Sequence, residues 1–241
     1  MFGVLDLSTF ADMFSSEQIT GLHLPEKTFC LTFDDGPGET LGDGPGPKTL
    51  PLARYLREEN IPATFFCVGR FIKQYPSILS ELNRTGHFIG NHTYHHPDMK
   101  ALFENGQTVE CLEEIKMTDD LIRNIIPEKP VYFRAPYGQW TAEMSHFLNK
   151  EFTMAHTYAG PFYWEVNGND YAFWDRHLSA EECAAAYLIE IEKTNRGLFL
   201  MHDSTSDIEN MRLNNRTYET VRLLVPVLKE RGFTFIGIDK L

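Results

Sequence analysis

Two adjacent acids stand at the end of an apolar run near the start of the sequence. The run 28–33 leads into Asp34 and Asp35, and Gly36 and Pro37 follow at once. Two carboxylates held this close repel each other unless a cation lies nearby. Acids are also common in ordinary turns, so the pair alone is weak evidence. It is a candidate cation site that needs further ligands.

Three histidines within five residues supply such ligands. His92, His95 and His96 belong to the segment NHTYHH at 91–96. The i, i+4 spacing of His92 and His96 would put both imidazoles on one face of a helical turn. Two histidines and one aspartate, with the remaining positions open to water, are typical of catalytic rather than structural zinc. We expect His95, which lies off that face, to have a supporting role.

Two further apolar runs end in chemically useful side chains. Arg134 opens the segment RAPYG at 134–138, and its guanidinium has the geometry to clamp a carboxylate. The same segment also fits a surface turn with a solvated arginine. Near the C-terminus the run 197–201 leads directly into His202 and Asp203, which are both titratable.

Strand-like and helix-like segments alternate along nearly the whole chain and must position these residues. The predicted strands are 28–33, 63–68, 88–90, 132–133, 152–157, 197–201 and 233–238. Three helices are clear. The first, 48–59, follows a proline; the second, 179–193, opens with the capping box SAEE; the third, 217–231, ends before Gly232.

This alternation predicts an α/β protein in which helices cover a parallel sheet. About seven strand–helix units favour a closed or nearly closed (β/α) barrel. An open doubly wound sheet is the alternative. In both architectures the active site lies at the C-terminal ends of the strands. Because the candidate residues directly follow strands, we expect them to meet there.

Charge and composition limit the classes of partner. The formal net charge is −12, which argues against nucleic acid or an anionic membrane surface as a partner. No run of about eighteen apolar residues predicts a membrane span. The first fourteen residues lack a basic region and contain two acids, so they do not predict a secretory signal. We expect either a cytoplasmic protein or one whose leader lies outside this sequence.

The cysteines do not indicate a disulfide framework or a zinc site. Cys30, Cys67, Cys111 and Cys183 are widely spaced and form no CxxC pair. We expect free, buried thiols.

Four segments together resemble the polysaccharide deacetylases of the NodB-homology type, carbohydrate esterase family 4. TFDDGP at 32–37, HTYHH at 92–96, RAPYG at 134–138 and LMHD at 200–203 match the family's motifs in order. The resemblance covers roughly 28–239. It implies a distorted (β/α) barrel of about seven strands, with 1–27 as an N-terminal extension and 28–241 as the catalytic domain.

The resemblance also implies a role for each motif residue. Asp34 would be the general base that deprotonates a metal-bound water, and Arg134 would pair with it. Tyr137 would offer its backbone N–H to the oxyanion, and His202 would be the general acid. The implied metal ligands are Asp35, His92 and His96. Zn²⁺ is the expected ion, although such a set also accepts Co²⁺, Ni²⁺ or Mn²⁺.

One family motif matches less well. The family places an Asp-Trp pair in a loop before the last motif, where the Asp orients the catalytic histidine. Here Asp170, followed by Tyr171, is the better candidate for this partner of His202, and Glu165 is the alternative. The segment 160–174 is rich in aromatic residues, and we expect Trp164 to contact substrate, with core packing as the alternative.

The implied activity is removal of N-acetyl groups from N-acetylglucosamine-containing polysaccharide, either chitin oligomers or peptidoglycan. Amide hydrolysis needs an activated water, a stabilised oxyanion and a proton for the nitrogen, and the sequence offers a residue for each. Two alternatives remain: an acetylxylan-type O-acetyl esterase with the same site, and a sugar-binding protein without catalysis. The Gly- and Pro-rich segment 36–47 is either a surface loop or one wall of the substrate groove.

Overall fold

The computed structural model describes residues 14–127, 130–152, 158–205 and 207–241. The strands are β1 (Thr28–Asp34), β2 (Ala63–Cys67), β3 (Phe88–Asn91), β4 (Val131–Phe133), β5 (Tyr158–Ala159), β6 (Val166–Asn167), β7 (Arg196–His202) and β8 (Thr234–Phe235). The helices are α1 (Thr49–Glu58), α2 (Gly69–Gln74), α3 (Pro76–Arg84), α4 (Met99–Glu104), α5 (Thr108–Arg123), α6 (Ala142–Glu151), α7 (Asp170–Asp175), α8 (Ala180–Thr194), α9 (Glu209–Leu213) and α10 (Thr217–Glu230).

The strands form one parallel sheet in the order β5-β4-β3-β2-β1-β7-β6, and β8 pairs with β1. β5 and β6 lie at the two ends of this order, and the segment 160–165 connects them along the chain. This segment forms hydrogen bonds to strands on both sides of the opening between β5 and β6. The N–H of Phe162 donates to Phe133 of β4 at 2.9 Å, and that of Glu165 to Leu198 of β7 at 3.0 Å. The predicted α/β fold is confirmed, and this bridging segment completes its distorted barrel.

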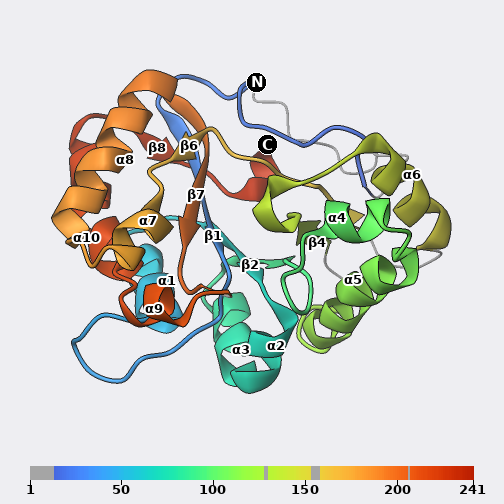
Figure 1. Cartoon of the computed structure of the whole chain (residues 1–241). Helices are drawn as coiled ribbons and strands as arrows, with labels where there is room; N and C mark the ends of the chain where they lie inside the picture. The colour runs from blue at the N-terminus through green and yellow to red at the C-terminus, as the bar shows by residue number, and fades with distance from the viewer. Residues whose placement is uncertain (1–13, 128–129, 153–157, 206) are drawn as a thin grey trace.

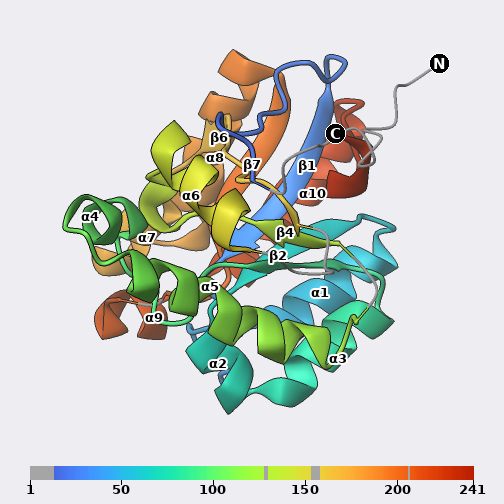
Figure 2. The same cartoon turned by 90° about the vertical axis from the view of Figure 1, so that its right-hand side faces the viewer.

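Helices cover the sheet. α8 packs on α10, α10 on α1, α1 on α3, α3 on α2 and α2 on α5, so the contacting pairs form an arc around the strands (Figures 1 and 2). β1 is buried along its whole length, which explains its nearly continuous apolar run. Phe29, Leu31 and Phe33 belong to the large core between sheet and helices, whereas Cys30 belongs to a smaller cluster inside the barrel.

Within the described residues the predicted elements are largely present, with one difference at the edge of the barrel. The last strand is shorter than predicted, because the chain turns inward after Phe235 and places Ile238 and Leu241 in the inner cluster. Of the strand predicted at 152–157, residues 153–157 lie outside the described residues. The three predicted helices match α1, α8 and α10, and the capping box at Ser179 is formed.

Residues 14–24 pack against the domain. Phe14 is fully buried among aromatic rings of the large core. The N–H of Ser15 donates to Gly160, and Ile19 forms a parallel bridge with Phe162. All four cysteines are free and buried, as predicted. Within the described ranges, no helix has the length and apolar character needed to cross a membrane.

Candidate active site

The predicted site residues meet at one edge of the sheet. Asp34, the last residue of β1, is in register with His202, the last residue of β7. His92 directly follows β3 and Arg134 directly follows β4, two strands that end side by side. The carboxyl ends of parallel strands lie at the same edge of a sheet, so the sheet brings these side chains together.

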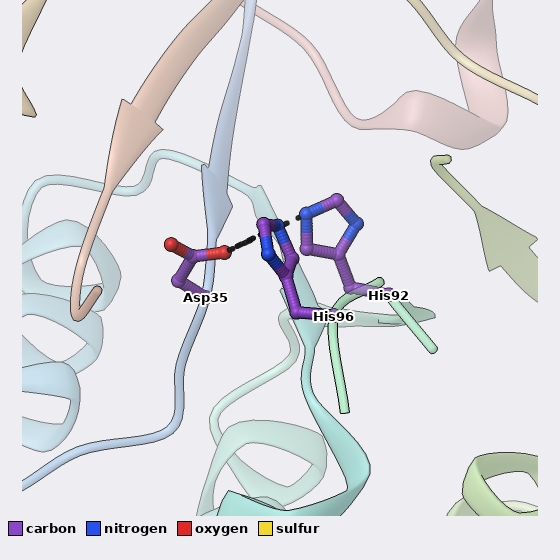
Figure 3. A group of neighbouring side chains, drawn as sticks. All are labelled: Asp35, His92 and His96. Atoms are coloured by element: carbon purple, nitrogen blue, oxygen red, sulfur yellow. Dashed lines mark ion pairs between the residues drawn. The ribbon is translucent and has the colours of Figure 1, made fainter. Parts of the chain in front are cut away.

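Asp35, His92 and His96 form a buried group in which one ligand atom from each lies within 4.8 Å of the others (Figure 3). The Asp35 Oδ1 is 3.6 Å from the His92 Nε2 and 3.2 Å from the His96 Nε2. The spacing of the two histidines suggested a shared helical turn, and this prediction is wrong. They lie on a loop in which Thr93 and His96 have left-handed φ angles of 67° and 66°.

Each imidazole is held through its Nδ1, which fixes the tautomer. The His92 Nδ1–H donates to the carbonyl oxygen of Arg134 at 2.8 Å, and the His96 Nδ1–H donates to the Asp207 carboxylate at 3.0 Å. In the neutral form of each ring, Nε2 therefore carries the lone pair toward Asp35. Two imidazole nitrogens and one carboxylate oxygen are a donor set that fits a divalent ion such as Zn²⁺.

The surroundings shift the pKa values of the two imidazoles in opposite directions. Burial lowers the pKa of His92 to about 3, so this ring is neutral. Burial acts in the same direction on His96, but the Asp35 and Asp207 carboxylates outweigh it and raise the pKa of His96.

A buried carboxylate on α5 supports the loop of the histidines. Glu114 accepts hydrogen bonds from the N–H groups of Tyr94 and His95, at 2.9 and 2.7 Å, and from the His95 ring at 2.6 Å. His95 thus lies outside the group of ligand atoms, as expected. Asn91, at the end of β3, accepts from the N–H of Thr93 at 2.8 Å and fixes the start of the same loop.

Arg134 is fully buried and binds Asp34. Its Nη1 donates to the Asp34 Oδ1 at 2.8 Å and to the Thr32 hydroxyl at 2.6 Å. Two further bonds go to the carbonyl oxygens of Phe162 and Tyr163, so no solvated surface turn exists here. Burial raises the pKa of Asp34, and the Arg134 guanidinium opposes this rise.

His202 pairs with Asp170, the first residue of α7. The His202 Nδ1–H donates to the Asp170 Oδ1 at 2.7 Å, which leaves Nε2 facing the cavity. Burial disfavours the imidazolium, but the Asp170 carboxylate outweighs it and raises the pKa of His202 to about 10. Glu165, the alternative partner, instead accepts from the N–H groups of Gly21 and Leu198.

The turn Pro136–Gly138 carries Tyr137 in a left-handed conformation, with φ of 58°. Such a conformation is uncommon for a bulky residue and is often found at functional sites. The Tyr137 hydroxyl donates to Asp207 at 2.6 Å. Trp164 stacks on Tyr163 at 4.2 Å and lies 5.7 Å from the Arg134 guanidinium.

A cavity of about 420 Å³ opens over the site. Its lining includes Asp34, Asp35, His92, His96, Tyr137, Trp164 and His202, together with Ile208 and Met211 near α9. A neighbouring cavity of about 360 Å³ is lined in part by Pro37, Gly38 and Pro47 of the segment 36–47. Both cavities share Thr205 and Asp207.

Sequence reasoning missed Asp207 and Glu114. Neither belongs to a recognisable motif, and each reaches the site through a side-chain contact that depends on the folded chain. Glu114 lies on a helix with no other feature pointing to the site, and Asp207 lies in a polar connection four residues after Asp203. The sequence contains no signal that would have singled out either residue.

Comparisons with known proteins identify the family of the chain. The family model for polysaccharide deacetylase matches residues 22–154. The chitooligosaccharide deacetylase of Azorhizobium caulinodans is 32% identical over 203 residues, which cover 80% of this chain and 88% of the relative. A peptidoglycan-N-acetylglucosamine deacetylase of Bacillus cereus is 30% identical over 216 residues, covering 87% of this chain and 68% of the relative.

The fold has a close counterpart among solved structures. The crystal structure of a peptidoglycan N-acetylglucosamine deacetylase superposes with a TM-score of 0.70 at 22% identity, covering 94% of this chain and 91% of the other. The motif residues at the strand ends, the matching family model and the similarity along most of the sequence lead to one conclusion: the chain belongs to the polysaccharide deacetylase family.

Proposed function

We propose that this protein is a metal-dependent hydrolase that removes N-acetyl groups from N-acetylglucosamine-containing polysaccharide, such as chitin oligomers or peptidoglycan. The named activities of its relatives support the substrate class. One observation carries the proposal. A carboxylate held by Arg134 and an imidazole held by Asp170 line the same cavity as the three candidate ligands.

Asp35, His92 and His96 would hold the ion, with Zn²⁺ as the first candidate. When bound, a divalent ion lowers the pKa of the attacking water and polarises the acetyl carbonyl. Asp34 takes the proton from that water as the new C–O bond forms. Arg134 supports this role because its charge favours the ionised carboxylate and its four hydrogen bonds fix where that carboxylate points.

The remaining steps use Tyr137 and His202. The backbone N–H of Tyr137 stabilises the oxyanion of the tetrahedral intermediate, an interaction that elsewhere contributes about 10²–10³-fold to kcat. His202 then gives its Nε2 proton to the nitrogen, the C–N bond breaks, and acetate and the free amine leave. With a pKa of about 10, His202 is protonated at neutral pH, as a general acid must be.

Trp164 is the best candidate for contact with the sugar. Its ring lines the cavity beside the turn of Tyr137. Flat aromatic faces provide a large apolar contact area, and the apolar face of a sugar ring is complementary to them. Trp164 also packs against Arg134, so its contact with the sugar and its support of the base are both expected to matter.

The test is release of acetate from N-acetylglucosamine oligomers and from peptidoglycan, by metal-free protein and by protein reloaded with Zn²⁺. We expect release only from the reloaded protein. Asp34→Asn should lower the rate by about 10²–10⁴-fold, the usual contribution of a general base. Asp120→Asn, which changes an exposed aspartate on α5, is the matched control and should leave the rate unchanged.

Three outcomes would contradict the proposal. The first is a rate that ignores metal removal. The second is an Asp34→Asn variant as fast as the unchanged protein. The third is zinc-loaded protein that releases acetate from neither polymer.

A further inference from the structure

The connection between β7 and α9 places a carboxylate behind one of the candidate metal ligands. The Asp207 Oδ2 accepts the Nδ1–H of His96 at 3.0 Å. The same oxygen accepts the hydroxyl hydrogen of Tyr137 at 2.6 Å. The rings of His96 and Tyr137 pack edge to face with centroids 4.7 Å apart. One oxygen atom thus ties a metal-ligand candidate to the turn that presents the candidate oxyanion donor.

We propose that Asp207 is a positioning residue that holds His96 in its metal-binding tautomer and orientation. This inference rests on the proposed metal site. It differs from the assignment of the ligands themselves, because Asp207 contacts the His96 Nδ1 and the candidate ligand atom is Nε2. A carboxylate that accepts the outer N–H of a ligating histidine fixes the ring and makes the ligand nitrogen more basic.

The two histidines differ in how they are supported. The outer nitrogen of His92 is bound by the main-chain carbonyl of Arg134, which a side-chain substitution leaves in place. His96 has a backbone φ of 66° on a loop, and the hydrogen-bond partner of its ring is the side chain of Asp207. His96 is therefore the ligand whose orientation depends on a residue that can be replaced.

The position of Asp207 in the chain links the two halves of the site. β7 ends at His202, the candidate acid, and Asp207 follows five residues later, before α9 begins. Its side chain is 39% exposed and lines both cavities. Because it is only half buried, its replacement should leave the fold intact, and its effect on metal binding can be measured separately.

The test is the dissociation constant for Zn²⁺, measured by competition with a chromophoric chelator. Asp207→Ala should weaken zinc binding by about 10–100-fold, the usual effect of removing such a partner. Asp207→Asn retains an acceptor without the charge and should fall between Asp207→Ala and the unchanged protein. Glu209→Gln, two residues away and paired with Arg212, removes the same charge and should leave the constant unchanged.

Tyr137→Phe separates the two hydrogen bonds of Asp207, because it removes the bond from the Tyr137 hydroxyl and leaves the bond from His96. We expect zinc affinity within about twofold of that of the unchanged protein, and the denaturation midpoints of all metal-free variants should agree. Zinc binding by Asp207→Ala at the unchanged affinity would overturn the inference. An equal loss of zinc affinity in Tyr137→Phe would also overturn it, because Asp207 would then act on zinc binding through the turn of Tyr137 and not through His96. Failure of the unchanged protein to bind Zn²⁺ would instead overturn the proposed metal site.

Discussion

At the scale of single residues, the site uses the same side chain in two charge states. Burial lowers the pKa of His92 to about 3 and keeps its ring neutral, as a metal ligand must be. His202 is also shielded from solvent, but the Asp170 carboxylate raises its pKa to about 10. What each ring contacts, rather than the residue type, separates a ligand candidate from an acid candidate.

Asp170→Asn should therefore shift the pH dependence of deacetylation. Without the carboxylate the pKa of His202 falls toward 6.5, and the alkaline limb of kcat moves from near pH 10 to near neutrality. At pH 8 only about 3% of a histidine with a pKa near 6.5 is protonated, so we expect acetate release to fall by about 30-fold, with a smaller loss near pH 6. The measurement is kcat across pH 5–10. Asp175→Asn, on the same helix but exposed, is the control, and an unshifted limb in Asp170→Asn would refute the assignment.

The same contact links folding stability to pH. A histidine whose pKa is higher in the folded state than in the unfolded chain stabilises the fold most when both states are protonated. The contribution of His202 is thus fully present below about pH 6.5 and is lost as the pH rises through about 10. Asp170→Asn should remove this part of the pH dependence of unfolding.

The motif residues could be predicted from the sequence because each lies at or directly after the end of a strand. A parallel sheet then brings Asp34, Arg134 and His202 to one edge without further information. The residues that support them could not be predicted. The contact of Asp207 with His96 joins positions 111 residues apart, and that of Glu114 with His95 depends on where α5 packs. No local sequence pattern indicates either of these two contacts.

At the scale of elements, the turn Pro136–Gly138 leaves no space for a larger residue. Gly138 has a φ of 64°, and a Cβ placed there would lie 2.7 Å from the Trp164 ring and 2.8 Å from the Tyr163 ring. The absence of a side chain at this position allows the two aromatic rings to pack beneath the turn. The turn and the stack Tyr163–Trp164 therefore form a single packed unit over Arg134.

Gly138→Ala should damage activity more than stability measurements alone would suggest. The added methyl group pushes on the rings of Trp164 and Tyr163 and so displaces the turn, and we expect kcat/KM to fall by at least about tenfold, since displacements near 1 Å can cost about 10²-fold. Gly106→Ala is the matched control, because Gly106 also has a positive φ, 77°, but has open space around it. Both variants carry backbone strain of about 1–2 kcal/mol, measured by denaturant unfolding. Equal activities in the two variants would contradict the packing argument.

The elements that were predicted correctly are those with a continuous pattern. β1, β2 and β7 are long, buried apolar runs, and the capping box at Ser179 indicates the start of α8. β6 was missed because its two residues lie within an aromatic segment that has no alternation. The helical turn suggested by the spacing of His92 and His96 is wrong, because hydrogen bonds to Glu114 and Asn91 fold that loop instead.

At the scale of the whole molecule, the proposed metal site should contribute to stability, because its ligands come from two separate strand ends. An ion that binds only the folded chain stabilises it by about 2.7 kcal/mol when its concentration is 100 times the dissociation constant. For a chain of this size we expect Tm to rise by about 2–4 °C per kcal/mol. The measurement is thermal unfolding with Zn²⁺ and with a chelator. His92→Ala should abolish the difference, and a zinc effect that persists in that variant would place the ion elsewhere.

The packing of the N-terminal segment affects where the chain can be shortened. The family model begins at residue 22, and a protein trimmed to that point would keep every residue of the candidate site. It would lose Phe14, whose ring lies between those of Phe133, Phe152 and Tyr158 with centroids 5.2–5.5 Å away. Emptying such a space costs about 3–5 kcal/mol, a large part of the stability of an ordinary domain. An expression boundary drawn from motifs alone would cut through the core.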